Sequence, residues 1–153
     1  MKNELKINLN DQEKDLLLQD LCSRLPYGVM CDVGDNKPYT LSRIEIDDKN
    51  GHLLDFKEKK GGLDMQVYLS ECRPYLVPLS SMTKEQREEF LNIQSEDRKR
   101  LLDALIKYRY EEEDKIPIIP LQKHIDWLNA HHFDYRGLIP MGLANDATGL
   151  NIY

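Results

Sequence analysis

The residue types best suited to metal chemistry gather near the end of the sequence, at His124, Asp126, His131, His132 and Asp134. Imidazole and carboxylate groups are ordinary ligands of zinc and of non-haem iron. Their spacing does not suit one site, because His124 and His131 lie two helical turns apart, roughly 10 Å along a helix axis, whereas ligands on one helix usually lie three or four residues apart. We therefore expect no metal site, and a metal-dependent hydrolase built on this cluster is the less favoured alternative.

Nucleophilic and phosphate chemistry have no matching motif in the sequence. Ser80 and Ser81 lie outside any G-x-S-x-G elbow, and Gly61-Gly62 is not followed by the Lys and Ser/Thr of a phosphate-binding loop. The three cysteines are odd in number and far apart, which indicates buried thiols and no disulfide framework. The sequence therefore predicts no catalytic residue and no cofactor, which favours a protein that is not an enzyme.

One basic cluster is the feature closest to a nucleic-acid surface, because it combines cations with Tyr108 and Tyr110. The acids Glu96, Asp97 and Asp103 lie among its cations, which favours an ordinary salt-bridged helix. A site for nucleic acid or for an acidic partner is the alternative. The candidate nucleic-acid residues are Arg98, Lys99, Arg100, Lys107 and Arg109.

Composition places the chain among ordinary globular proteins. The 153 residues are 41% hydrophobic and 31% charged, with a net charge of -6, so one core is expected and a surface that is basic all round is excluded. No stretch approaches the ~18 apolar residues of a membrane span, and residues 1–10 have no apolar signal-peptide core. We expect a single cytoplasmic domain, residues 1–153, without a membrane partner.

The first element is a predicted helix from Asp11 to about Arg24. Asn10 and Glu13 form a capping pair, and Leu18, Leu21, Cys22 and Leu25 follow at helical spacing. Pro26 then ends the helix because its ring fixes φ and removes a hydrogen-bond donor.

Residues 28–79 change to short apolar stretches separated by turn residues, which is typical of small antiparallel strands. Four or five strands fit, with a tight hairpin at Asp48-Lys49-Asn50-Gly51. Strands this short must curl into a small barrel or pack on helices. The predicted class is α+β: an N-terminal helix, a small curled antiparallel β-meander for which an SH3-like barrel is favoured, and a helical C-terminal half.

Residues 83–132 are predicted to be helical. Thr83 and Gln86 form a second capping box. Two readings stay open: a helix to about Gln94 followed by one that begins at Ser95, or a single bent helix over 83–112. Pro120 suits the first position of a last helix, which is expected to end near His132.

The tail, residues 133–153, is rich in turn residues, yet it holds Phe133, Tyr135, Leu138 and Ile139. A free tail with these side chains would expose an apolar patch. We therefore expect the four residues to pack back onto the domain, and a chain that ends at His132 to be unstable.

Three stretches carry a resemblance to a known group of proteins. They are residues 16–29 (LLLQDLCSRLPYGV), 73–83 (RPYLVPLSSMT) and 125–139 (IDWLNAHHFDYRGLI). In them the chain resembles uncharacterised proteins of gut Bacteroidales and their prophages or mobile elements. It departs from that pattern after Ile139, where Pro140-Met141 replaces an acidic-basic pair. The resemblance implies a bacterial or phage setting and transfers no catalytic residue.

The last of these stretches mixes rings and charges in a way shared by domain cores and by partner-binding hot spots. The leading hypothesis is a non-enzymatic binding or adaptor protein whose partner is another protein, and a nucleic-acid-binding accessory factor is an alternative. The candidate binding residues are Trp127, His131, His132, Tyr135 and Arg136.

Overall fold

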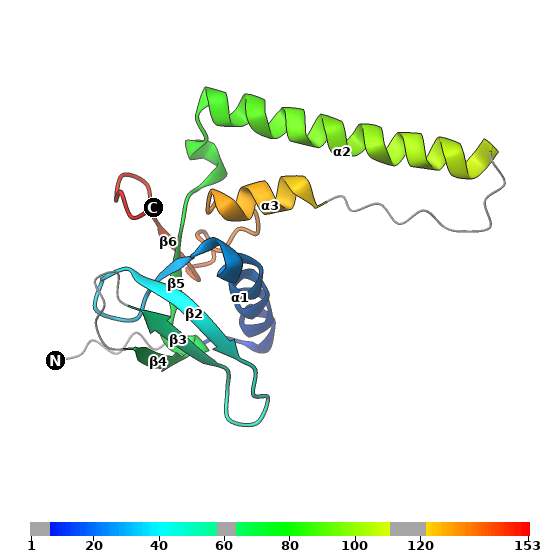
Figure 1. The fold of residues 1–153 in the computed structure, drawn as a ribbon. Coiled ribbons are helices and arrows are strands. Elements are labelled where there is room, and N and C mark those ends of the chain that lie inside the picture. Colours follow the sequence, from blue (N-terminus) through cyan, green and yellow to red (C-terminus); the bar gives the residue numbers. More distant parts are fainter. Residues whose placement is uncertain (1–6, 58–63, 111–121) are drawn as a thin grey trace. The chain divides into compact units, whose positions relative to one another are not determined.

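Figure 1 shows a computed structural model of the chain, in which residues 7–57, 64–110 and 122–153 are described, with the backbone alone for 107–110. The chain groups into two compact units. Unit 1 comprises Met1–Leu79 with His132–Tyr153, and unit 2 comprises Ser80–His131. That residues 1–153 behave as a single domain stays a prediction.

Unit 1 begins with helix α1, Asp11–Arg24, whose predicted bounds are confirmed. The Glu13 backbone N–H donates to Asn10 Oδ1 at 2.9 Å, and the Asn10 N–H donates to Glu13 Oε2 at 2.9 Å, which satisfies two amide donors at the helix start. A short 3-10 helix, η1 (Leu25–Tyr27), follows and ends at Gly28 in the left-handed region, with φ +68°. After Gly28 the chain enters the first strand of the sheet.

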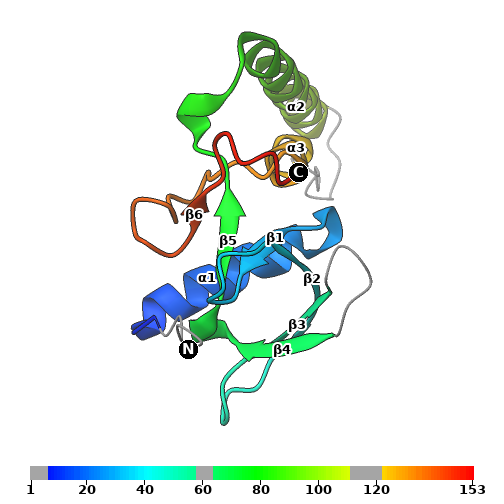
Figure 2. The ribbon, with the colours of Figure 1, turned by 90° about the vertical axis from the view of Figure 1, so that its left-hand side faces the viewer.

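Among the described residues of unit 1, six strands form one sheet in the order β4-β3-β2-β1-β5-β6. The neighbouring strands from β4 to β5 in this order all pair antiparallel. Along the chain, the 3-10 helix η2 (Leu69–Glu71) lies between β4 and β5. Figure 2 shows β2, β3 and β4 curving together. The strands are β1 (Met30–Asp32), β2 (Tyr39–Glu45), β3 (Leu53–Lys57), β4 (Met65–Tyr68), β5 (Arg73–Leu76) and β6 (Asn145–Asp146).

These elements confirm the α+β class, with one correction to the predicted antiparallel sheet. β6 comes from the tail and pairs parallel to β5, with Tyr75 opposite Asn145, so the sheet is mixed. Within the described residues the pairing ends at β4 on one side and β6 on the other. The sheet is therefore curled but is not closed into a barrel by strand pairing.

The tail packs into the core of unit 1, as its apolar content predicts. Phe133 and Leu138 are 1% and 0% exposed, and Ile139 packs against the core cluster. The Val77 N–H donates to the His132 carbonyl at 2.9 Å, and the Asp134 N–H donates to the Val77 carbonyl at 2.8 Å. The main core residues are Leu17 and Leu21 of α1, Leu41, Leu54, Phe56 and Leu76 of the sheet, and Leu138 and Leu143 of the tail.

In the part that the structure describes, unit 2 holds the long helix α2 and the short helix α3. α2 runs without a break from Lys84 to Tyr110, so Ser95 lies inside a helix and the single-helix reading is correct. The Thr83–Gln86 capping box is present, with Gln86 N–H donating to Thr83 Oγ at 3.1 Å. α3 spans Lys123–Ala130 and ends just before the predicted end at His132. Its predicted start at Pro120 lies outside the described residues.

None of the helices in the described part of the chain is long and apolar enough to cross a membrane.

Candidate functional site

The three histidines of the cluster near the end of the sequence, His124, His131 and His132, each have a partner of their own. His124 Nδ1 lies 3.0 Å from Asp97 Oδ2, the His131 ring stacks on Trp127 at 4.0 Å, and the His132 ring stacks on Tyr153 at 3.5 Å. Across residues 7–57, 64–110 and 122–153, no group of three or more His, Cys, Asp or Glu side chains is placed to hold a metal ion.

Trp127 and His131, two of the candidate binding residues, pack within unit 2. Trp127 is 8% exposed, and its ring lies between Phe90, at a centroid distance of 5.4 Å, and His131. His131 Nδ1 lies 2.9 Å from the Trp127 carbonyl. These contacts fix the end of α3 against the Phe90 side of α2.

Tyr135 and Arg136, from the same predicted set, lie in unit 1 and join the tail to α1. Arg136 donates to Gln19 Oε1 at 3.1 Å and to Ser23 Oγ at 3.2 Å. The Tyr135 ring lies 5.1 Å from the Arg136 guanidinium carbon and 5.2 Å from that of Arg24. Their side chains are therefore engaged inside the fold.

An ion pair beneath Tyr135 completes this junction. Arg24 Nε donates to Asp20 Oδ2 at 2.8 Å, and neither side chain is exposed. Arg24 also donates to the Phe133 carbonyl at 2.7 Å, and Arg136 Nε lies 3.3 Å from Asp20 Oδ1. Burial raises the pKa of Asp20, against the lowering effect of Arg24. Tyr135 and Arg136 thus lie against a buried ion pair of unit 1, whereas His132, the third predicted binding residue of this unit, stacks on Tyr153.

The basic cluster lies on α2. Arg98, Lys99 and Arg100 are exposed, whereas Asp97 is 3% exposed. The hydrogen bond to His124 holds the pKa of Asp97 below its usual range. Lys107 and Arg109 also lie on α2, but their side chains are outside the described residues. The structure therefore displays three of the five predicted cations.

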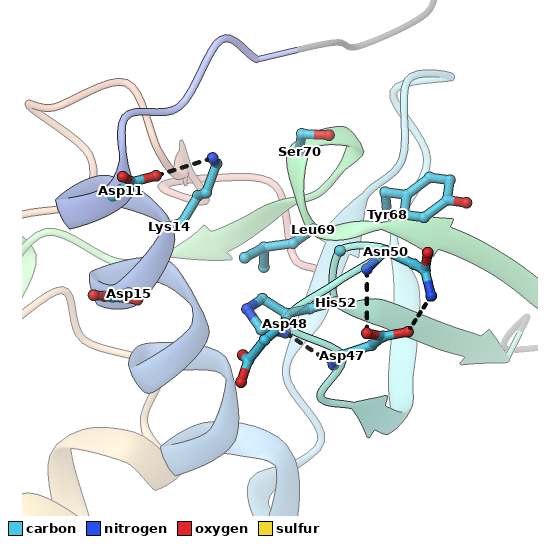
Figure 3. Close-up of a pocket in the computed structure, with 11 residues that line it drawn as sticks. Asp11, Lys14, Asp15, Asp47, Asp48, Asn50, His52, Tyr68, Leu69 and Ser70 are labelled. Atoms are coloured by element: carbon cyan, nitrogen blue, oxygen red, sulfur yellow. Dashed lines mark hydrogen bonds and ion pairs between the residues drawn. The ribbon is translucent and has the colours of Figure 1, made fainter.

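A pocket of about 560 Å³ lies in unit 1, between the first turn of α1 and the β2–β3 hairpin. Figure 3 shows the lining side chains of α1 to one side and those of the hairpin to the other. Four of the lining residues are aspartates and one is a lysine, so we call it the acidic pocket. Its lining comprises Asp11, Lys14, Asp15, Asp47, Asp48, Asn50, Gly51, His52, Tyr68, Leu69 and Ser70.

Asp47 holds the hairpin side of the acidic pocket in shape. Its carboxylate accepts from the Lys49 N–H at 2.8 Å and from Asn50 Nδ2 at 2.9 Å. The Asn50 side chain and these amides hold the pKa of Asp47 below its usual range. The turn closes at Gly51, whose backbone has φ +93°. A residue with a side chain would be strained in this conformation, which explains the glycine.

His52 forms part of the pocket wall in a defined tautomer. The Asp47 N–H donates to His52 Nδ1 at 3.3 Å, so in the neutral ring the proton is on Nε2. The His52 carbonyl accepts from the Leu69 N–H at 3.0 Å, which positions η2 beside the hairpin. The neighbouring Tyr68 ring is 48% exposed.

Charge in the acidic pocket is only partly neutralised. Lys14 Nζ lies 3.3 Å from Asp11 Oδ1. Asp15 and Asp48 have no ion-pair partner within the part of the chain that the structure describes. Negative charge facing a half-exposed ring is chemistry suited to a cationic group.

The sequence did not point to this pocket. In the sequence Asp47-Asp48 is a pair of adjacent acids and Asp11 is the first residue of the predicted helix, so only the fold brings them together. The turn sequence Asp48-Lys49-Asn50-Gly51 was the one available signal, because it places the hairpin. Comparison of the chain with protein-family models, curated proteins and solved structures gives no match.

Proposed function

We propose that this chain is a non-enzymatic binding or adaptor protein of a phage or mobile element, and that the acidic pocket receives a cationic side chain of a partner protein. The observation that carries the proposal is the lining of four aspartates against one lysine. The setting rests on the resemblance to Bacteroidales prophage proteins. In that setting the protein acts in the bacterial cytoplasm.

A guanidinium or an ammonium group suits this lining for two reasons. Carboxylates make charge-assisted hydrogen bonds with such groups, which are about twice as strong as neutral ones. The Tyr68 ring, which is 48% exposed, offers a face to the same cation. Phosphate groups carry the wrong charge for this pocket, so nucleic acid is not its ligand.

A segment of a protein fits better than a lone cation. Exposed ion pairs contribute only about 0.2–1 kcal/mol each, and Asp11 is an exposed residue whose side chain is 98% accessible. Several contacts from one chain are therefore needed for specific binding. An extended peptide with Arg or Lys beside an apolar residue supplies them.

The test is a titration with a fluorescently labelled, Arg-rich peptide, followed by anisotropy. The pocket variant carries Asp15→Asn and Asp48→Asn, and Asp47 is left intact because it holds the turn. The matched control carries Glu88→Gln and Asp103→Asn on α2, which removes the same charge from another surface. A version of the peptide with Glu in place of Arg is the second probe.

We expect the pocket variant to weaken binding of the Arg-rich peptide by about tenfold, equivalent to about 1.4 kcal/mol, and the control variant to leave it nearly unchanged. Binding should also weaken as salt is added. Equal losses in the two variants would mean that net charge alone attracts the peptide, and the proposal would be wrong.

A further inference from the structure

Helix α2 presents one face to α3. On that face the Phe90 ring lies 5.4 Å from the Trp127 ring, and Asp97 lies 3.0 Å from His124. These contacts occupy the side of α2 that carries Phe90, Ile93, Asp97, Leu101 and Ala104, all of which are buried or half-buried.

A second row on α2 is apolar and exposed. Leu91, Leu102, Leu105 and Ile106 are 55%, 57%, 49% and 48% exposed. The last three have i, i+3, i+4 spacing, and Leu91 lies about three turns before Leu102, so all four fall on one side of the helix. A row of large apolar side chains at this exposure is typical of an interaction surface.

Cations accompany this row. Arg98 lies four residues before Leu102, and Arg87 lies four residues before Leu91, so both share its side of the helix, while Lys99 flanks it. All three are exposed, and none forms an ion pair with another described residue. The surface is therefore apolar around Leu102, Leu105 and Ile106, with Leu91 as a separate apolar residue three turns earlier, and it carries cations beside them. We call Arg87, Leu91, Arg98, Lys99, Leu102, Leu105 and Ile106 the outer stripe.

We propose that the outer stripe docks an acidic amphipathic helix of a partner protein. A helix laid along α2 buries its apolar side chains on Leu102, Leu105 and Ile106, which is how amphipathic helices bind apolar surfaces. Its Glu or Asp residues then face Arg98 and Lys99. The outer stripe lies in unit 2, so it is a second proposed contact surface, separate from the acidic pocket of unit 1.

Two other occupants fit the outer stripe less well. A nucleic acid would use the cations, but it leaves Leu102, Leu105 and Ile106 against a charged backbone, where they contribute nothing. A second copy of α2 would bring another Arg87 and Arg98 beside the first pair, and like charges at an interface disfavour association. Charge complementarity therefore favours the acidic helix.

The test uses a designed helical peptide with Leu at a, d and e positions and Glu elsewhere, and a second peptide with Lys in place of every Glu. Binding to the full chain is followed by fluorescence anisotropy of the labelled peptides. The apolar variant carries Leu102→Ser and Leu105→Ser, and the charge variant carries Arg98→Glu and Lys99→Glu. Leu150→Ser, at a residue of unit 1 that is 53% exposed, is the control, and circular dichroism verifies that each variant is folded.

We expect the acidic peptide to bind at least about tenfold more tightly than the basic one, and either double variant to remove about tenfold in affinity, or about 1.4 kcal/mol. The charge variant keeps the test valid if the apolar variant does not fold. Equal affinity for the two peptides would overturn the proposal. So would displacement by an oligonucleotide at similar concentration, or a dimer in light scattering that only the apolar variant dissociates.

Discussion

Three charged side chains, Asp20, Arg24 and Arg136, account for how the tail is held in unit 1. Taking Asp20 and Arg24 out of water costs several kcal/mol for each ion, so their pairing at 2.8 Å does not by itself imply net stabilisation. Its effect is positional. Arg24 reaches the Phe133 carbonyl and Arg136 reaches α1, so a displaced tail removes one hydrogen bond from Arg24 and the second cation from beside Asp20.

At this scale we predict that Arg24→Leu lowers the free energy of unfolding by about 3 kcal/mol. Removing one partner of a buried ion pair costs about 3–5 kcal/mol, and the lower value applies because Arg136 stays beside Asp20. The double variant Asp20→Leu with Arg24→Met should lose less, since both members of the fully buried pair are removed together and Arg136 keeps its hydrogen bonds to Gln19 and Ser23. Urea denaturation measures both. A double variant that is less stable than Arg24→Leu would contradict this account.

Among the elements, α2 and α3 are joined by aromatic packing at one end and by the Asp97–His124 contact further along. Asp97 comes from the Phe90 side of α2, where a charge is costly unless it is paired. The His124 hydrogen bond at 3.0 Å satisfies one of its oxygens and stabilises the ionised form.

This contact predicts a dependence of stability on pH. Because His124 holds the pKa of Asp97 below its usual range, the contribution is complete above the carboxyl pKa of the unfolded chain, about 4. It is lost as the pH falls through the lower pKa of the folded state. Asp97→Asn should therefore lower the melting temperature at neutral pH, and its deficit should shrink as the pH falls from about 4 to about 2.

Melting curves of the wild type, Asp97→Asn and Glu96→Gln across that range provide the measurement. Glu96 is the matched control because it lies next to Asp97 but is exposed, and its contact with Lys123 is 3.9 Å long. A deficit for Asp97→Asn that stays constant with pH would show that its carboxylate makes no titrating contribution.

Elements with strong local signals were the predictable part of the fold. The capping residues and Pro26 fixed α1, and turn residues located the β2–β3 hairpin. β6 was missed because Asn145 and Asp146 have no strand pattern, and their pairing depends on β5, far away in the sequence. Ser95 resembles a helix cap locally, yet α2 continues past it because Ile93 before it and Asp97 after it both lie on the side that packs against α3.

The candidate sites show the same limit. Trp127, Tyr135 and Arg136 were selected for their chemistry, but burial decides whether such side chains serve a partner or the fold. Burial is not encoded within a few residues. The acidic pocket was missed for the related reason that its walls come from α1, the hairpin and η2.

For the molecule as a whole, the connection between the units is the informative feature. Unit 2, Ser80–His131, is inserted between two parts of unit 1. The chain leaves unit 1 after Leu79 and returns at His132. Val77, just before the exit, donates its backbone N–H to the His132 carbonyl at 2.9 Å. The exit and the return are therefore neighbours within unit 1, as in proteins that tolerate an inserted domain.

We predict that replacing Ser80–His131 by a short Gly-Ser linker leaves unit 1 folded. The linker has only a short distance to close, and the core from Leu17 to Leu143 is retained. Circular dichroism and urea denaturation should show β-structure and one cooperative transition. A chain without a cooperative transition would instead support the prediction that residues 1–153 form one domain.

The inserted position of unit 2 also bears on the order of events during synthesis. A ribosome adds roughly 5–20 residues per second. Synthesis of unit 2 therefore separates residues 1–79 from residues 132–153 by a time on the order of seconds. During that interval Leu76 lacks Leu138 and Leu143, and the β5 edge that later pairs with β6 is open. The nascent chain thus exposes an unpaired strand, which makes it a substrate for chaperones or proteases until its last strand arrives.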